Sequence, residues 1–222
     1  MKFLLIRPGN QKEDSKHVML PPLGLLYLGA ILENNGHEVE ILDYSAKNIS
    51  KEQLKNSLIS SDAVGMSIQT IDFKPPNDIL KMIKDLDSNI PLIIGGPHCT
   101  FVQDHSLQDI PLADISVIGE GEFVILDLVK YFQGVKNISD IHGIYYRNNG
   151  SIYAGKPLRI IDNLDSLPFP ARHLVEKNEY GNSPHGYQLK GKVTSLISSR
   201  GCPCHCRFCT RYANMIDGWG FR

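Results

Sequence analysis

The chain has 222 residues, 42% of them hydrophobic and 21% charged, which is enough apolar material for the core of one large or two small domains. The 23 Lys and Arg residues nearly balance the 24 Asp and Glu residues, and this net charge of −1 argues against a nucleic-acid-binding protein. The longest apolar run, residues 23–32, is too short to span a bilayer, and the four apolar residues before Arg7 do not make a signal peptide.

Five cysteines, four of them within eight residues, do not fit a secreted disulfide framework. We therefore expect a soluble, cytoplasmic protein without a membrane span.

The first 135 residues alternate strand-like and helix-like segments. Short apolar runs predict five strands, over Lys2–Arg7, Glu38–Asp43 and residues 63–68, 91–94 and 115–118. Apolar spacing, Gly36 as a stop signal and a capping box at Ser50 predict five helices. These helices are expected over residues 23–35, after Ser50 through Leu58, around Ile79 to Leu86, near residues 100–107 and over residues 123–132.

Strands that alternate with helices predict right-handed βαβ units and a parallel sheet with both faces covered. The expected fold class is α/β, with a doubly wound, flavodoxin-like or Rossmann-like parallel sheet. Such sheets bind ligands beyond the carboxyl ends of their strands. The loops expected at that edge are residues 7–9, 67–70, 95–98 and 119–122, and all are rich in Gly, Pro or hydroxyl groups. This composition fits loops that bind a large ligand, and it fits ordinary βα turns equally well.

The composition changes after residue 135. Asn149-Gly150 between residues 143–147 and 151–155 predicts a β-hairpin. The two prolines in residues 167–170 exclude a helix there and indicate a linker within residues 160–174. Residues 177–191 read as a loop, and residues 193–198 as a strand that leads into the cysteine-rich segment.

Cys202, Cys206 and Cys209 have a C-x3-C-x2-C spacing directly after that expected strand. Three thiolates on so short a loop can ligate one iron–sulfur cluster and leave its fourth iron open for a substrate or cosubstrate. Between residues 190 and 222 there are six basic residues and one acidic residue, and nearby positive charge lowers the pKa of thiols.

A structural zinc site also fits this spacing, because Cys204 or His205 can supply a fourth ligand. Cys204 is interpreted here as a residue that is not a ligand. Both kinds of metal site remain open on the residues alone.

The segment Ser199-Arg200-Gly201-Cys202-Pro203, followed by Cys206-Arg207-Phe208-Cys209, resembles the cluster loop of radical S-adenosylmethionine (SAM) enzymes. The whole chain resembles the subgroup that carries an N-terminal cobalamin (B12)-binding domain. The segments similar to that subgroup's first helix, ligand loops and interdomain linker are residues 21–28, 65–70, 95–98, 119–122 and 164–172.

The resemblance implies that Cys202, Cys206 and Cys209 hold a [4Fe–4S] cluster, whose open iron binds SAM, and that Phe208 packs near the SAM adenine. It implies cobalamin-binding roles for Ser67, Thr70, Gly95, Gly96, Gly119 and Glu120. The implied reaction is reductive cleavage of SAM to a deoxyadenosyl radical, with cobalamin-assisted methyl transfer or cyclisation of a small-molecule substrate. A flavodoxin or a ferredoxin would be the electron donor, and the catalytic residues are not identified.

The resemblance also implies domain boundaries. Residues 1–135 would form the cobalamin-binding domain, residues 136–191 the hairpin and linker, and residues 192–222 the first strand and cluster loop of a radical SAM barrel. The chain stops thirteen residues after Cys209, so we expect a truncated core that does not turn over alone.

The D-x-H-x-x-G motif of other cobalamin proteins is absent, and no histidine ligand to cobalt is expected. His98 is either a neighbour of the cofactor or an ordinary loop histidine. Asp43 and Tyr44 would contact a cofactor or serve in a turn. Glu120 and Glu122 would bind ligand amides or favour a helix start.

Two other functions are open. One is a cobalamin-independent radical SAM enzyme of the methylthiotransferase type, although Cys99 is the only cysteine before the cluster loop. The other is a non-catalytic cobalamin-binding module with a zinc-stabilised tail.

Overall fold

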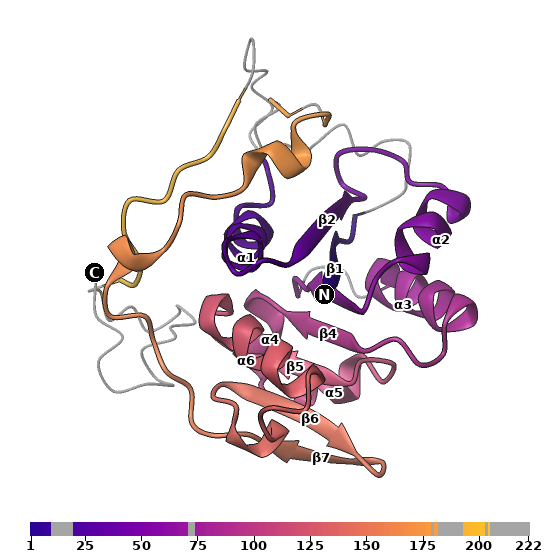
Figure 1. Ribbon diagram of the computed structural model, residues 1–222, viewed down its shortest axis with the longest axis vertical. Helices are drawn as coiled ribbons and strands as arrows, with labels where there is room; N and C mark the ends of the chain where they lie inside the picture. Colours follow the sequence, from indigo (N-terminus) through magenta and orange to yellow (C-terminus); the bar gives the residue numbers. More distant parts are fainter. Residues whose placement is uncertain (10–19, 71–73, 179, 182–192, 203, 205–222) are drawn as a thin grey trace.

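The computed structural model of the chain describes residues 1–9, 20–70, 74–178, 180–181, 193–202 and 204. A seven-stranded sheet with helices on both faces forms its centre (Figure 1). The strands are β1 (Lys2–Arg7), β2 (Glu38–Asp43), β3 (Ala63–Ser67), β4 (Leu92–Gly95), β5 (Ile115–Val117), β6 (Ile144–Asn148) and β7 (Ser151–Ala154). The helices are α1 (Leu23–Asn34), α2 (Lys51–Ile59), α3 (Lys74–Leu86), α4 (Pro97–Val102), α5 (His105–Asp109) and α6 (Glu122–Phe132).

The sheet order is β2-β1-β3-β4-β5-β6-β7, and the first five strands in this order are parallel. The order 2-1-3-4-5 is the flavodoxin-like one. The predicted α/β fold class is therefore confirmed. Parallel pairing places the carboxyl ends of β1, β3, β4 and β5 along one edge, where their loops meet.

Two hydrophobic layers cover the sheet. One face packs against α2, α3, α4 and α5, and its core includes Leu54, Ile79 and Leu107. The other face packs against α1 and α6, and its core includes Leu26 and Leu128. Figure 1 shows α1 and α6 on one side of the strands and α2 and α3 on the opposite side.

The predicted end of α1 and the predicted start of α2 are confirmed. Gly36, with a φ of 78°, lies just after α1. The Ser50 hydroxyl accepts a hydrogen bond from the Gln53 amide at 3.2 Å, and the Gln53 side chain accepts one from the Ser50 amide at 2.8 Å. This reciprocal pair is the predicted capping box at the start of α2.

The single helix expected near residues 100–107 is wrong. The structure has α4 and α5 there, with a break at Gln103, whose φ is 55°. Gln103 also accepts a hydrogen bond from the hydroxyl of Tyr145 in β6 at 3.1 Å. Glutamine is a good helix former, so local propensity gives no sign of a break that a distant strand helps to hold.

The hairpin expected around Asn149-Gly150 is confirmed, and both residues have positive φ values, 48° and 80°. Its strand β6 pairs antiparallel with β5 and so extends the sheet. This pairing was not expected, because the hairpin was assigned to a separate segment after residue 135. The domain boundary itself stays a prediction.

The predicted linker contains two short 3-10 turns, Leu164–Ser166 and Arg172–Val175, and the proline-containing residues 167–170 between them are not helical. The strand expected over residues 193–198, as the first strand of a radical SAM barrel, is wrong in this structure. A strand needs a neighbouring strand to pair with. Residues 194 and 195 instead receive hydrogen bonds from the Arg172 side chain, to Thr194 Oγ1 and to the Ser195 carbonyl oxygen.

None of the helices in the described ranges has both the length and the apolar character that crossing a membrane requires.

The capping box makes a first testable prediction. Ser50→Ala removes the side-chain acceptor of the Gln53 amide and should lower the free energy of unfolding by about 1 kcal/mol. Urea unfolding followed by far-UV circular dichroism measures this difference. Ser88→Ala, at an exposed serine that caps no helix, is the matched control, and an equal loss in both variants would contradict the capping role.

Candidate functional site

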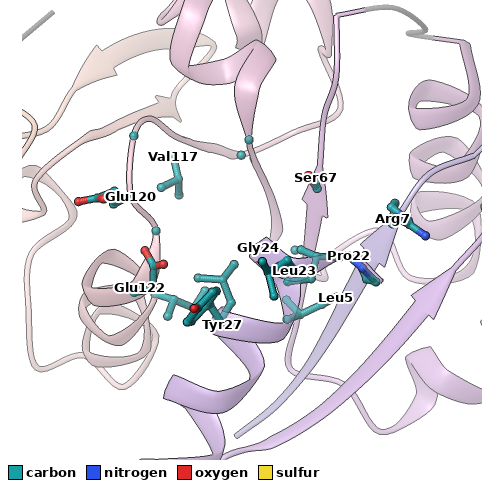
Figure 2. A pocket seen from close by; sticks show the side chains of 18 of the residues that line it. Leu5, Arg7, Pro22, Leu23, Gly24, Tyr27, Ser67, Val117, Glu120 and Glu122 are labelled. Carbon is teal, nitrogen blue, oxygen red and sulfur yellow. The ribbon is translucent and has the colours of Figure 1, made fainter. Parts of the chain in front are cut away.

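A cavity of about 610 Å³ lies at the carboxyl edge of the sheet, on the face covered by α1 and α6. Its floor consists of residues from four parallel strands, Leu5, Gly65, Ile93 and Val117. Figure 2 shows Leu23, Gly24 and Tyr27 from α1 beside this floor, with Arg7 on one side and Glu120 and Glu122 on the other. The cavity therefore occupies the place where a doubly wound sheet binds its ligand.

Glycines make up much of the cavity wall. Among the described residues, seven glycines line it, namely Gly24, Gly65, Gly95, Gly96, Gly119, Gly121 and Gly201. At Gly96 the backbone has a φ of 99°, and an added Cβ would lie 3.0 Å from Ser67 Oγ and 3.1 Å from the Ile68 carbonyl oxygen. The loops after β3 and β4 thus pack so closely that only glycine fits, and backbone groups face the cavity.

Thr100 of α4 joins two of these loops. Its hydroxyl donates to the Gly96 carbonyl oxygen at 2.9 Å and accepts from the Gly119 amide at 2.9 Å. Thr100 is buried, so this contact fixes the spacing of the loops after β4 and β5. No motif in the sequence distinguished this threonine from an ordinary helix residue.

His98 lies next to the same loops but outside the cavity lining. Its ring is buried, with Nε2 3.1 Å from an Asp109 carboxylate oxygen and Nδ1 3.5 Å from Thr70 Oγ1. Neither His98 nor Thr70 lines the cavity. The geometry favours a structural role for His98 over that of a cofactor neighbour.

Arg7, at the end of β1, forms a buried network on one side of the cavity. Its guanidinium donates two hydrogen bonds to the Asp43 carboxylate, at 2.7 Å and 2.5 Å. Asp43 is completely buried and also accepts from the Tyr180 hydroxyl at 2.8 Å and from the Ser45 amide at 3.0 Å. Burial raises the pKa of Tyr180, so its phenol stays protonated and donates. Of the two roles considered for Asp43, the structure shows the one in a turn, through the hydrogen bond from the Ser45 amide. Asp43 also orients the Arg7 guanidinium.

Arg200 forms a second network on the opposite side. It donates to Glu120 Oε1 at 2.9 Å and to Glu122 Oε1 at 2.5 Å, and its guanidinium carbon lies 5.4 Å from the centre of the Tyr27 ring. Burial lowers the pKa of Arg200, but hydrogen bonds and negative charge from Glu122 and Glu120 outweigh burial and raise it overall. The other oxygen of Glu120 accepts from the Ile161 amide at 2.6 Å.

The structure brings most of the described candidate residues together. Ser67, Gly95, Gly96, Gly119 and Glu120 all line the cavity, whereas Thr70 does not. Gly201 also lines it, and the exposed Cys202 follows directly. Cys206, Phe208 and Cys209 lie outside the described residues. Their proposed roles therefore stay predictions.

Several lining residues were not among the predicted site residues. Tyr27 and Gly24 lie in the segment that resembles the first helix of the cobalamin subgroup. The sequence therefore pointed to this segment, but no binding role was predicted for either residue. Arg7 lay in an expected ligand loop. Arg200 lay inside the cysteine motif, where nothing in the sequence pointed to its carboxylate partners.

The cavity fits a large cofactor with many neutral polar groups. Its floor is apolar, its walls expose glycine backbone and the Ser67 side chain, and its lining charges come from two arginines and two glutamates already paired with one another or with Asp43. Cobalamin has this chemistry, since its corrin ring is edged by carboxamide arms. Cys202 and Cys204 are both exposed, so the described part of the cysteine loop leaves thiols accessible to a metal.

Cys99 has a different environment. It is completely buried in α4, and burial raises the pKa of its thiol to about 12 despite hydrogen bonds with Ser116 and Ser106. A buried, protonated thiol is a poor metal ligand. This environment speaks against a second cluster of the methylthiotransferase type at Cys99.

Comparison with known proteins gives the same picture of the fold. The B12 binding domain family matches residues 17–129. "Uncharacterized methyltransferase PH0819" of Pyrococcus horikoshii is 29% identical over 225 residues, which cover 99% of this chain and 47% of that protein. The anaerobic magnesium-protoporphyrin IX monomethyl ester cyclase of Rubrivivax gelatinosus is 28% identical, over 96% of this chain and 39% of the cyclase.

Two solved structures share the fold. OxsB, a cobalamin-dependent SAM radical enzyme with aqua-cobalamin and SAM bound, superposes with a TM-score of 0.78 at 20% identity, over 100% of this chain and 29% of OxsB. The radical SAM methyltransferase TsrM of Kitasatospora setae, with cobalamin and a [4Fe–4S] cluster bound, gives a TM-score of 0.68 at 18% identity, over 99% of this chain and 42% of TsrM. The chain spans less than half the length of each of these proteins.

The burial of Cys99 makes a second prediction. In native, metal-free protein at pH 8, a thiol with a pKa of about 12 is ionised in only about one molecule in 10⁴, and Cys99 should resist iodoacetamide. Peptide mapping by mass spectrometry should show alkylation of the exposed Cys202 and Cys204 first. Cys99 should react after unfolding in urea. Native-state labelling of Cys99 as fast as Cys202 would contradict the buried position.

Proposed function

Since the chain belongs to the B12 binding domain family, we propose that it forms the cobalamin-binding portion of a radical SAM enzyme that transfers a methyl group or closes a ring. The observation that carries this proposal is the continuity of the cavity with the cysteine loop. Gly201 lines the cavity at the carboxyl edge of the sheet, and Cys202 is the next residue.

The residues of the cavity would divide the binding of cobalamin between them. Backbone groups around Gly95, Gly96 and Gly119, together with the Ser67 hydroxyl, would bind its neutral polar arms. Tyr27 and Leu23 would pack against its apolar surface. His98, which is held by Asp109 and does not line the cavity, would not take part in this binding.

The cysteine loop would provide the second half of the site. Cys202, Cys206 and Cys209 would hold a [4Fe–4S] cluster through their thiolates, and Phe208 would pack near the SAM adenine. Bound together, the reduced cluster and SAM would supply a deoxyadenosyl radical, and the cobalamin would supply a methyl group or a cobalt centre. A flavodoxin or a ferredoxin would deliver the electron. The names of the relatives, methyltransferases and a cyclase, support this range of outcomes.

A substitution inside the cavity tests cobalamin binding. Gly24 lines the cavity near the start of α1, and an added Cβ there would meet no atom within 4 Å. Gly24→Leu therefore adds a side chain at the cavity wall without a clash at its Cβ, and it replaces a poor helix former with a good one. Hydroxocobalamin titration monitored by absorbance should show wild-type binding and a roughly tenfold or greater loss of affinity in the variant, about 1.4 kcal/mol or more.

Asn34→Leu, at an exposed position on the same helix outside the cavity, is the matched control and should bind as the wild type does. Unfolding measurements should show that Gly24→Leu is as stable as the wild type. Absence of cobalamin binding to the wild-type chain would refute the proposal.

Metal analysis tests the cysteine loop. After anaerobic reconstitution, the wild-type chain should carry about four iron and four sulfide per chain, as one [4Fe–4S] cluster requires. Replacement of Cys202, Cys206 and Cys209 together by Ala should abolish this loading, whereas Cys204→Ala should keep it. Full iron loading of the triple variant would contradict the assignment, and one zinc per chain without iron or sulfide would favour a structural site.

A further inference from the structure

The Arg200 side chain connects the residues next to the cysteine loop with the loop at the end of β5. It precedes Cys202 by two positions, and its partners Glu120 and Glu122 lie 80 and 78 residues away in sequence. Each carboxylate accepts a hydrogen bond from a different terminal nitrogen of the guanidinium. The fork is planar and holds both glutamates in one arrangement.

Both glutamates pair with this cation in a buried position. Their side chains are only 6% and 7% exposed, so the surrounding protein shields both charges from water. Removal of the cation from a buried group of opposite charges leaves uncompensated charge, which a loop relieves by moving toward solvent. The position of the loop over residues 119–122 and the position of Arg200 therefore depend on each other.

The same residues form one wall of the cavity. Tyr27, Glu120, Glu122, Arg200 and Gly201 all line it, and the Tyr27 ring faces the guanidinium. Glu120 also accepts a hydrogen bond from the Ile161 amide of the linker. The linker and the residues before the cysteine loop are therefore both bound to the same carboxylate at this wall. A ligand in the cavity contacts a wall whose shape is fixed by the Arg200 contacts.

On the basis of the function proposed above, we propose that Arg200 is a positioning residue that couples cobalamin binding in the cavity to cluster assembly on the Cys202 loop. Both events favour the same arrangement, with the β5 loop closed on Arg200 and Cys202 held at the mouth of the cavity. Each bound cofactor then strengthens binding of the other. Because coupling of two binding equilibria is reciprocal, it can be measured from either side.

The experiment compares cobalamin affinity in two metal states of the full chain. Hydroxocobalamin is titrated anaerobically, with absorbance detection, into protein with and without a reconstituted iron–sulfur cluster. The wild type should bind roughly fivefold or more tightly when the cluster is present, the lower end of typical coupling between sites. In Arg200→Gln both cofactors should still bind, but the affinity ratio between the two metal states should fall to about one.

Further variants separate positioning from a general loss of structure. Arg200→Lys keeps the charge but cannot fork between two carboxylates, so it should restore only part of the ratio. Glu122→Gln keeps the shape of the side chain and should lower the ratio by itself. The double variant Arg200→Gln/Glu122→Gln should be no worse than Arg200→Gln, because both changes remove one interaction. Arg147→Gln, at an arginine that binds the backbone of Leu107 and Ala113 away from the cavity, should keep the wild-type ratio.

The outcomes distinguish this inference from the proposed function. A wild-type chain that binds both cofactors with a ratio of one, or an Arg200→Gln variant with the wild-type ratio, overturns the coupling and leaves the proposed function intact. A wild-type chain that binds no cobalamin or assembles no cluster refutes the proposed function, and the coupling falls with it. If Arg200→Gln does not fold, as judged by circular dichroism, an unchanged ratio in Glu122→Gln overturns the coupling in its place.

Discussion

Parallel pairing of β1, β3, β4 and β5 is the constraint on which the site depends. It places the carboxyl ends of four strands along one edge, so their loops must share one space. The strand order reverses beside β1, since β2 lies on one side of it and β3 on the other, and adjacent loops leave the sheet toward opposite faces there. The cavity opens at this position, and the tight packing of Gly96 against Ser67 and Ile68 holds the loops after β3 and β4 close together at its wall.

Two buried carboxylate sites connect the later part of the chain to this edge. Asp43 accepts a hydrogen bond from Tyr180 and forms an ion pair with Arg7, while Glu120 and Glu122 form ion pairs with Arg200. Buried ion pairs contribute little net stability, because removing charges from water costs about as much as their attraction returns. Their value lies in geometry, since a buried carboxylate accepts few arrangements of its donors. Tyr180 and Arg200 are thus held against the sheet edge in defined positions. Figure 1 shows residues 193–202 along the side of the molecule that carries α1.

Those features of the fold that depend on neighbouring residues were predictable from the sequence. The capping box of α2, the glycine after α1, the turn at Asn149-Gly150 and the apolar runs of the five parallel strands are encoded within a few positions. The break at Gln103 and the pairing of β6 with β5 depend on contacts between distant segments. The expected strand over residues 193–198 failed for the same reason, because apolar alternation indicates a strand only where a partner strand is available. At the site, the glycine loops were predictable by position, but the pairing of Arg200 with two glutamates about 80 residues away has no local sign.

The distribution of charge in the cavity explains which groups remain for a ligand. In the part of the chain that the structure describes, its charged lining residues are Arg7, Glu120, Glu122 and Arg200, and each is paired within the protein. A ligand with strong net charge would have to compete with those pairs. The other lining groups include glycine backbone, apolar side chains and the neutral polar side chains of Ser67, Gln69 and Ser199, and these suit neutral amides and an apolar ring system. Charged residues therefore hold the loops together, and neutral residues are left to bind. This division suits a cofactor edged with carboxamides better than a polyanion.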